Sequence, residues 1–157
     1  MVWPNDLLAV ILAVIAGGAI GLERELKGKA AGLRTNILIC LGSAVFTMIS
    51  KQMAANQPDS VTRIAAQIVT GIGFLGAGAI IQDRGGVHGL TTAATIWVVA
   101  SIGMACGAGF YNLAIIATLI ALVVLIGLGY AEKPLDHYGG KNKAKSSKED
   151  QPADKLD

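Results

Sequence analysis

The sequence predicts an all-α membrane protein: a compact bundle of about five transmembrane helices with the N-terminus outside and the C-terminus in the cytoplasm. Hydrophobic residues make up 53% of the 157 residues, charged residues only 15%, and the mean hydropathy is +0.56. These values are typical of integral membrane proteins rather than of water-soluble domains. Long uncharged stretches and an uneven placement of Lys and Arg indicate the same class.

The first uncharged run, Leu7–Leu22, predicts a membrane helix near residues 6–22. No basic residue precedes this run, as one would before the apolar part of a cleaved signal, so we expect a helix that is retained. Trp3 occupies the place of an interfacial aromatic residue, and Asn5 or Asp6 can cap the start of the helix.

Four more helices are predicted from the remaining uncharged runs. They lie near residues 35–52, 63–82, 89–106 and 111–130. The last two share one run, Gly89–Ala131, which at ~1.5 Å per residue is roughly twice as long as the ~30 Å hydrocarbon core of a bilayer. This run must therefore fold back once, and Gly107-Ala108-Gly109 is the natural break.

The distribution of positive charge predicts the orientation. If the chain crosses five times, every Lys and Arg except Lys51 and Arg63 falls on one side of the membrane. By the positive-inside rule that side faces the cytoplasm. We therefore expect a transmembrane domain at residues 1–131 and a disordered cytoplasmic tail at residues 132–157, where polar and charged residues predominate.

The third run contains Gly71-Ile-Gly73-Phe-Leu-Gly76, which matches the spacing of a dinucleotide-binding turn. Such a turn follows a strand, opens a helix and has an acidic residue about 20 positions later. Here the pattern lies inside an uncharged run, and Ile96 occupies the place of the acid. We therefore interpret these glycines as packing points between helices and expect no cofactor.

Pairs of small residues four positions apart let membrane helices approach closely. The predicted packing positions are Gly17, Gly21, Gly71, Gly73, Gly76, Gly78, Gly103 and Gly107. Packing inside one bundle is the first interpretation, and a homodimer interface is the alternative. The two cysteines, Cys40 and Cys106, should lie at opposite ends of their helices, too far apart for a disulfide, and act as small packing residues.

The predicted topology brings four helix ends together at the cytoplasmic face, and their polar residues form a candidate functional cluster. Its members are Glu23, Arg24, Glu25, Arg34, Thr35, Asp83, Thr91 and Thr92. The carboxylates are hard oxygen ligands suited to Mg²⁺, and the helix N-termini with Arg34 suit a phosphate-like anion. The alternative is a network of interfacial ion pairs and caps that fixes the register of the helices. Whether the cluster holds a metal stays open.

Other function classes find little support in the sequence. The predicted helices carry no acidic residue or His at mid-membrane depth, where proton-coupled transporters usually have one. No catalytic triad, P-loop or zinc motif occurs, and His88 has no partner at metal-ligand spacing. We therefore expect a protein that is not an enzyme and does not bind nucleic acid.

Several blocks of sequence resemble the MgtC/SapB family of bacterial inner-membrane proteins. These blocks are Gly21-Leu-Glu-Arg-Glu25, Ala31-Gly-Leu-Arg-Thr35, Gly71-Ile-Gly-Phe-Leu-Gly-Ala-Gly78 and Gly89-Leu-Thr-Thr-Ala-Ala94 followed by Trp97. The resemblance covers roughly residues 7–130. It implies a multi-pass protein of the bacterial inner (plasma) membrane, and it makes Cys106 a candidate for a functional cysteine of the family.

The resemblance also implies a function. Members of the family support growth at low magnesium and are thought to restrain the rotary ATP synthase through contacts in the membrane. We therefore expect a regulatory protein in magnesium homeostasis that contacts the lipid bilayer and another inner-membrane complex such as that synthase. A transporter or channel for magnesium or another ion is the alternative, and a purely structural dimer is the third hypothesis. Many members add a soluble domain after the last helix, where this chain is expected to have only its short tail.

Overall fold

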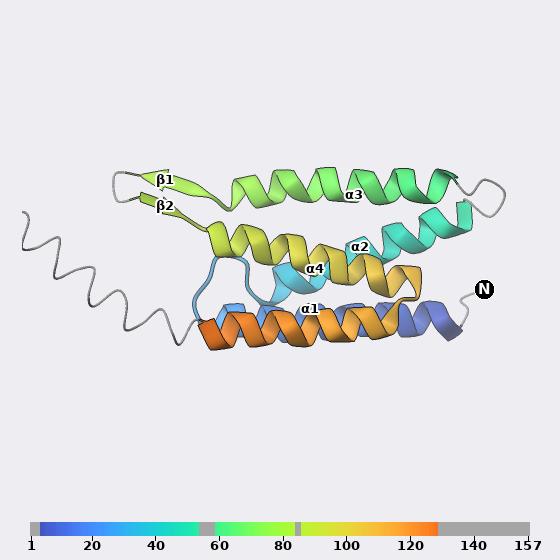
Figure 1. Ribbon diagram of the computed structural model, residues 1–157, viewed down its shortest axis with the longest axis horizontal. Coiled ribbons are helices and arrows are strands. Elements are labelled where there is room, and N and C mark those ends of the chain that lie inside the picture. Colours follow the sequence, from blue (N-terminus) through green and yellow to red (C-terminus); the bar gives the residue numbers. More distant parts are fainter. Residues whose placement is uncertain (1–3, 54–58, 84–85, 129–157) are drawn as a thin grey trace, which may run out of the picture. The chain divides into compact units, whose positions relative to one another are not determined.

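The computed structural model describes residues 4–53, 59–83 and 86–128, and the predicted tail at residues 132–157 lies outside them. The described residues form five helices and two short strands (Figure 1). In chain order these are α1 (Pro4–Leu26), α2 (Leu33–Met53), α3 (Asp59–Gly78), β1 (Ile81–Asp83), β2 (Gly86–His88), α4 (Leu90–Ala108) and a last helix, Tyr111–Leu128. The chain up to Leu122 forms one compact unit, which includes the first part of the last helix.

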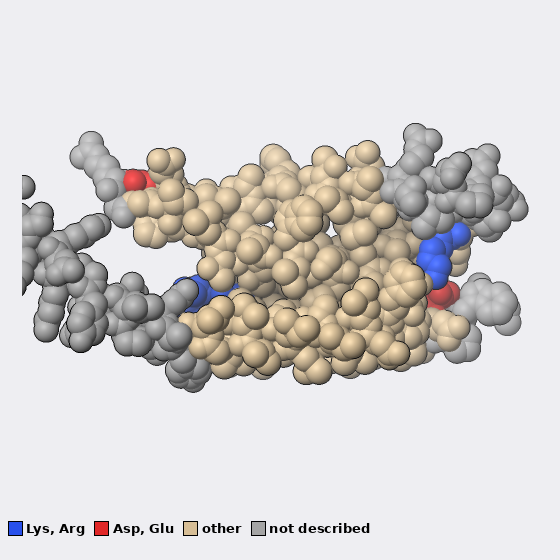
Figure 2. All heavy atoms as spheres, in the orientation of Figure 1, with Lys and Arg blue, Asp and Glu red and all other residues tan. Residues whose placement is uncertain are grey.

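Four of the five helices are long and apolar enough to cross a membrane. They are α1, α2, α4 and the last helix. The third predicted span corresponds to α3, whose apolar stretch Ala65–Gly78 is shorter, although its 20 residues rise about 30 Å in total, the thickness of a hydrocarbon core. On the face shown in Figure 2, the described charges gather at the two ends and the middle is uncharged. The chain is thus an all-α membrane protein, as the sequence predicts.

Helix α2 is packed closely between α1 and α4 at glycines. A Cβ atom added at Gly17 would lie 2.8 Å from Cβ of Cys40, and one added at Gly21 would lie 2.8 Å from Cα of Leu33. On the other side, Gly107 of α4 lies against the backbone of α2, where an added Cβ would come 2.9 Å from Cβ of Thr47. Gly103 makes the same kind of contact one turn earlier. At these four positions the structure shows the close approach that the spacing predicts.

Within the described residues, only one of the four α3 glycines predicted to pack, Gly76, lies against another helix. A Cβ atom added at Gly71, Gly73 or Gly78 would meet nothing within 4 Å, and one at Gly76 would only touch Ala93 at ordinary distances. Small residues permit a close approach but do not choose the partner helix. Helix α3 does not pack tightly against α2, and an open groove remains between the two helices.

The connection between α1 and α2 enters the bundle instead of staying at its end. Ala31 is buried in one cluster with Ile72 of α3 and with Ile96 and Ala100 of α4. Ile96 is roughly 9 Å along α4 from Leu90, at ~1.5 Å per residue, so α2 begins about that much deeper than α4 does. Irregular backbone at membrane depth is tolerated where protein buries it and satisfies its polar groups.

This offset corrects the prediction that the two cysteines lie far apart. Because α2 starts deeper than α4, Cys40 near its beginning reaches the level of residues near the end of α4. The backbone of Cys40 lies against Gly103, which is three residues before Cys106 on the same helix. Both thiols are free and buried, so the expectation that they are small packing residues fits their surroundings.

The third helix was predicted to reach residue 82, but α3 ends at Gly78 and a β-hairpin follows. Strand β1 pairs antiparallel with β2, with Ile81 opposite His88 and Gln82 opposite Val87. The run from residue 64 to residue 81 is uncharged throughout, so the absence of charge does not mark the end of the helix. The β-branched residues Ile80 and Ile81 and the Gly85-Gly86 pair favour a hairpin over a continued helix.

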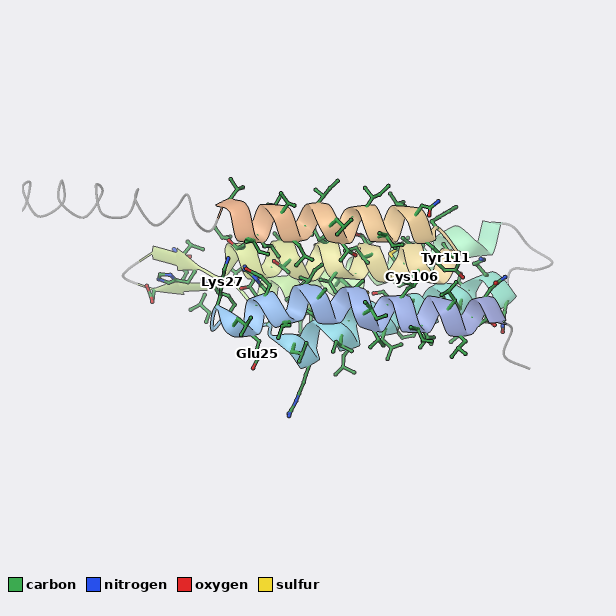
Figure 3. All side chains as sticks on the ribbon, turned by 90° about the horizontal axis from the view of Figure 1, so that it is seen from below. Glu25, Lys27, Cys106 and Tyr111 are labelled. Atoms are coloured by element: carbon green, nitrogen blue, oxygen red, sulfur yellow. The ribbon has the colours of Figure 1, made fainter. Side chains whose placement is uncertain are left out.

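The start of the last helix is fastened to the start of α1. The hydroxyl of Tyr111 donates a hydrogen bond to the carbonyl of Asn5 at 2.9 Å. Ala114 and Thr118 on the same helix are buried, while Leu119 is 58% exposed. Figure 3 shows Tyr111 and Cys106 toward one end of the bundle and Glu25 and Lys27 toward the other. The last helix therefore closes the bundle beside α1 and leaves much apolar surface facing lipid.

Candidate functional site

Glu23 and Arg24 form a buried ion pair near the C-terminal end of α1, the end that is predicted to be cytoplasmic. Arg24 is 2% exposed, and its Nε and Nη2 donate to the two carboxylate oxygens of Glu23 at 2.5 and 2.8 Å. The ammonium group of Lys27, one turn later, lies 2.6 Å from Oε1 of Glu23. Two cations thus contact one carboxylate, so the negative charge of Glu23 is compensated and the three side chains together carry one positive charge. This arrangement suits the interpretation in which these residues fix the helices rather than bind a free cation.

Glu25 and Asn36 satisfy the backbone at the end of the connection, where Ala31 and Gly32 are buried. The carboxylate of Glu25 accepts the backbone N–H of Leu33 at 3.0 Å and so caps the start of α2. The side-chain amide of Asn36 donates to the carbonyls of Ala31 and Gly32 at 2.7 and 2.8 Å. Buried polar backbone is costly unless it is paired, and these two side chains provide the pairing.

Asn36 is the main structural residue that sequence reasoning missed. It is fully buried against Gly21, and its Oδ1 has no hydrogen-bond partner among the described residues. In the sequence, Asn36 is one of several polar residues near the predicted start of a helix. The available signal was an amide side chain at the start of a long uncharged run, because a buried amide must find a hydrogen-bond partner.

An open groove runs between α2 and α3, with a volume of about 990 Å³. Its walls are mostly apolar, and α4 contributes Thr92 and Ile96 to its floor. Gly42 on α2 and Gly71 on α3 both line it, and an added Cβ at either would meet nothing within 4 Å. The missing side chains at these positions keep the groove open.

Arg34 and Thr35 line the same groove near the start of α2. Arg34 is exposed and is the one charged residue among the groove's lining residues. Thr92 is buried, whereas Thr91 is exposed and its carbonyl accepts a hydrogen bond from the hydroxyl of Thr95 at 2.7 Å. The threonines predicted to flank an anion site are therefore divided between the groove and the surface of α4.

Asp83 belongs to the hairpin rather than to the end of a helix. Its carboxylate lies 3.5 Å from Nε2 of His88 on the paired strand. Every described residue of β1 and β2 is exposed, including the apolar residues Ile81 at 63% and Val87 at 50%. The hairpin extends past the start of α4 in Figure 1. Ile81 shares one face of the hairpin with Asp83 and His88, whereas Val87 shares the other face with Gln82.

The predicted cluster is thus divided among several places. Glu23 and Arg24 form the buried pair, Glu25 caps α2, and Asp83 lies on the hairpin. Three further members, Arg34, Thr35 and Thr92, line the groove, and Thr91 is exposed on α4. Within residues 4–53, 59–83 and 86–128, no group of three or more His, Cys, Asp or Glu side chains is placed to hold a metal ion. The helix ends share one end of the bundle, as the topology predicts, but their charged groups serve separate roles.

The sequence matches a known family, because the MgtC family model fits residues 10–133. The chain belongs to the MgtC family. The matched residues take in the buried pair, the α1–α2 connection, the groove and the hairpin. These features are therefore elements of this chain's family domain rather than additions at its edges.

Curated relatives support the assignment. The chain is 51% identical over 125 residues to the putative magnesium transporter YhiD of Escherichia coli K12, a match that covers 76% of the chain and 58% of that protein. It is 44% identical over 155 residues to protein MgtC of Salmonella typhimurium LT2, covering 94% of the chain and 66% of that protein. The chain therefore spans about six tenths of the length of these relatives. No solved structure matches it.

Proposed function

We propose that the chain is a non-enzymatic, multi-pass protein of the bacterial inner membrane that acts by contact with another membrane complex in adaptation to low magnesium. The observation that carries this proposal is the β1–β2 hairpin. Its described side chains are all exposed, and two of them, Ile81 and Val87, are apolar. The register places Ile81 and Val87 on opposite faces, so each face of this projecting element offers one exposed apolar side chain that a partner can cover.

The charged residues of the bundle support contact rather than ion conduction. Glu23 is held by Arg24 and Lys27, and Glu25 is held by the backbone of Leu33. A conduction path needs oxygen ligands that an ion can enter and leave, and these carboxylates already have protein partners. Membership of the MgtC family and the resemblance noted above make the rotary ATP synthase the first partner to test.

Co-purification from mild detergent tests the proposal. The tagged chain should recover a membrane complex, and the double variant Ile81→Ser/Val87→Ser should recover much less of it. Leu119→Ser is the matched control, because Leu119 is 58% exposed but lies on the last helix, away from the hairpin. If both variants recover the partner as well as the parent chain does, the hairpin is not the contact surface.

Growth under magnesium limitation tests the physiological part of the proposal. A strain lacking the gene should grow poorly at low magnesium, and the parent chain and Leu119→Ser should restore growth. The hairpin double variant should not restore it, although it accumulates in the membrane. Full restoration by the double variant would contradict a role for the hairpin.

A transporter is the second candidate, favoured by the Escherichia coli relative, which is named a putative magnesium transporter. Purified chain in proteoliposomes, loaded with a Mg²⁺ indicator, would test it. Uptake above empty liposomes would support transport. Absence of uptake at matched protein density would remove this candidate and leave the contact proposal.

A further inference from the structure

The groove between α2 and α3 has an uneven distribution of charge. Most of its lining residues are apolar, and Phe46, Phe74 and Leu75 are widely exposed along it. No acidic residue lines it, and Arg34 alone among its lining residues carries a charge. A long apolar trough with one cation near its end has the polarity of an anionic amphiphile.

Arg34 has no carboxylate partner within the part of the chain that the structure describes. The nearby carboxylates are already engaged, Glu23 by Arg24 and Lys27, and Glu25 by the N–H of Leu33. Arg34 is the second residue of α2, which begins inside the bundle. Its long side chain can therefore extend along apolar surface while the guanidinium group stays at the boundary between the apolar and polar parts of the membrane. A guanidinium in this position binds phosphate well, because its donors match two phosphate oxygens.

We propose that this groove binds an anionic phospholipid, with the phosphate on Arg34 and an acyl chain along the walls formed by α2 and α3. The bilayer supplies such lipids at high local concentration. Gly42 and Gly71 leave space for the acyl chain, since nothing lies within 4 Å of an added Cβ at either. This inference does not depend on the proposed function, because a lipid can occupy the groove whichever partner the hairpin contacts.

The placement of charge favours a lipid over a helix. From Arg34 to Phe46 the groove follows α2 for roughly 18 Å, at ~1.5 Å per residue, and its one charged lining residue, Arg34, lies at one end of this length. A phospholipid has the same arrangement, with one phosphate at the end of long apolar chains. A helix of a partner or of a second copy that covered the apolar walls would leave Arg34 without an anion.

Native mass spectrometry of the intact, delipidated chain in mild detergent tests this proposal. The probes are phosphatidylglycerol, which is anionic, and phosphatidylethanolamine, which is zwitterionic, with matched acyl chains. Arg34→Gln should weaken phosphatidylglycerol binding by about tenfold and remove the preference for it. Lys29→Gln is the matched control, because Lys29 is exposed in the same connection but does not line the groove, and it should change binding by less than about threefold.

A second pair of variants tests the apolar part of the site. Gly71→Leu should fill the groove and reduce binding of both lipids, while Gly127→Leu, on the last helix, should not. Equal losses for Arg34→Gln and Lys29→Gln would show general charge attraction and overturn the proposal, as would unchanged binding in Gly71→Leu. A mass of two chains that Gly71→Leu reduces to one would assign the groove to a second copy and also overturn it.

Discussion

The backbone carbonyl of Cys40 lies directly against Gly103, so that α2 and α4 touch backbone to backbone in the middle of the bundle. A Cβ atom at residue 103 would also come within 2.9 Å of Cβ of Ser43, closer than real Cβ atoms approach. In a bilayer, packing of this kind rather than the hydrophobic effect holds helices together. The contact therefore sets the depth of α2, and with it the position of the connection that precedes α2.

Gly103→Ala should destabilise the bundle by about 1–3 kcal/mol, because the added methyl group forces α4 away from α2. Gly71→Ala is the control, since an added Cβ there meets nothing within 4 Å, and higher helix propensity should leave it as stable as the parent or up to ~1 kcal/mol more stable. Unfolding in mixed detergent micelles measures both. Equal stability of the two variants would mean that the helices are not in contact at residue 103.

Asn36→Asp should destabilise the protein by about 1–3 kcal/mol, because at least one of the two hydrogen bonds to the carbonyls of Ala31 and Gly32 is lost in a buried place. Asn112→Asp makes the same chemical change at an exposed position on the last helix and should have little effect. Protease sensitivity of the α1–α2 connection gives a second readout, and it should rise only in Asn36→Asp. If the two variants behave alike, Asn36 does not hold the connection.

Arg24→Met should cost about 3–5 kcal/mol, because it leaves the buried carboxylate of Glu23 with Lys27 alone. Lys27→Met, which removes the more exposed cation, should cost less than ~1 kcal/mol. Adding Glu23→Gln to Arg24→Met should recover much of the lost stability, since the buried charge is gone and the ammonium group of Lys27, 34% exposed, stays hydrated. Thermal unfolding in detergent measures all three, and a double variant no better than Arg24→Met would contradict the ion-pair explanation.

The hairpin variants should separate function from stability. Ile81→Ser and Val87→Ser change exposed side chains that pack on no helix core, so each should shift the free energy of unfolding by no more than ~0.5 kcal/mol. Thermal unfolding of the purified variants checks this. A large loss of stability would show that the hairpin is part of the fold, and the loss of partner binding expected above would then have a structural cause.

The sequence predicts the helices well and their partners poorly. Hydropathy and length locate α1, α2, α4 and the last helix, because a membrane span needs a long uncharged run. The same signal cannot show that α3 ends at Gly78, since Ile80 and Ile81 are as apolar as the residues before them. It also cannot show that α2 begins inside the bundle, which brings Cys40 and Cys106 together.

The candidate site shows the same division. The carboxylates of the cluster could bind one ion only if they lay close together. Glu23 and Asp83 instead lie on separate elements and contact separate partners. Side-chain pairing depends on burial and on the exact level of each helix, neither of which the spacing of residues reveals. The role of Asn36 could be predicted in part, because a buried side-chain amide must form hydrogen bonds with neighbouring polar groups.

The orientation of the chain is tested most directly by cysteine labelling in intact cells. Single substitutions Lys29→Cys in the α1–α2 connection, Val87→Cys in the hairpin and Gln52→Cys at the opposite end of α2 place exposed thiols at the two ends of the bundle, while the native thiols stay buried. With a membrane-impermeant maleimide on spheroplasts, we expect Gln52→Cys to label at once, and Lys29→Cys and Val87→Cys to label only after permeabilisation. Labelling of Lys29→Cys and Val87→Cys from outside, with Gln52→Cys protected, would place the connection and the hairpin on the wrong side for a cytoplasmic contact surface.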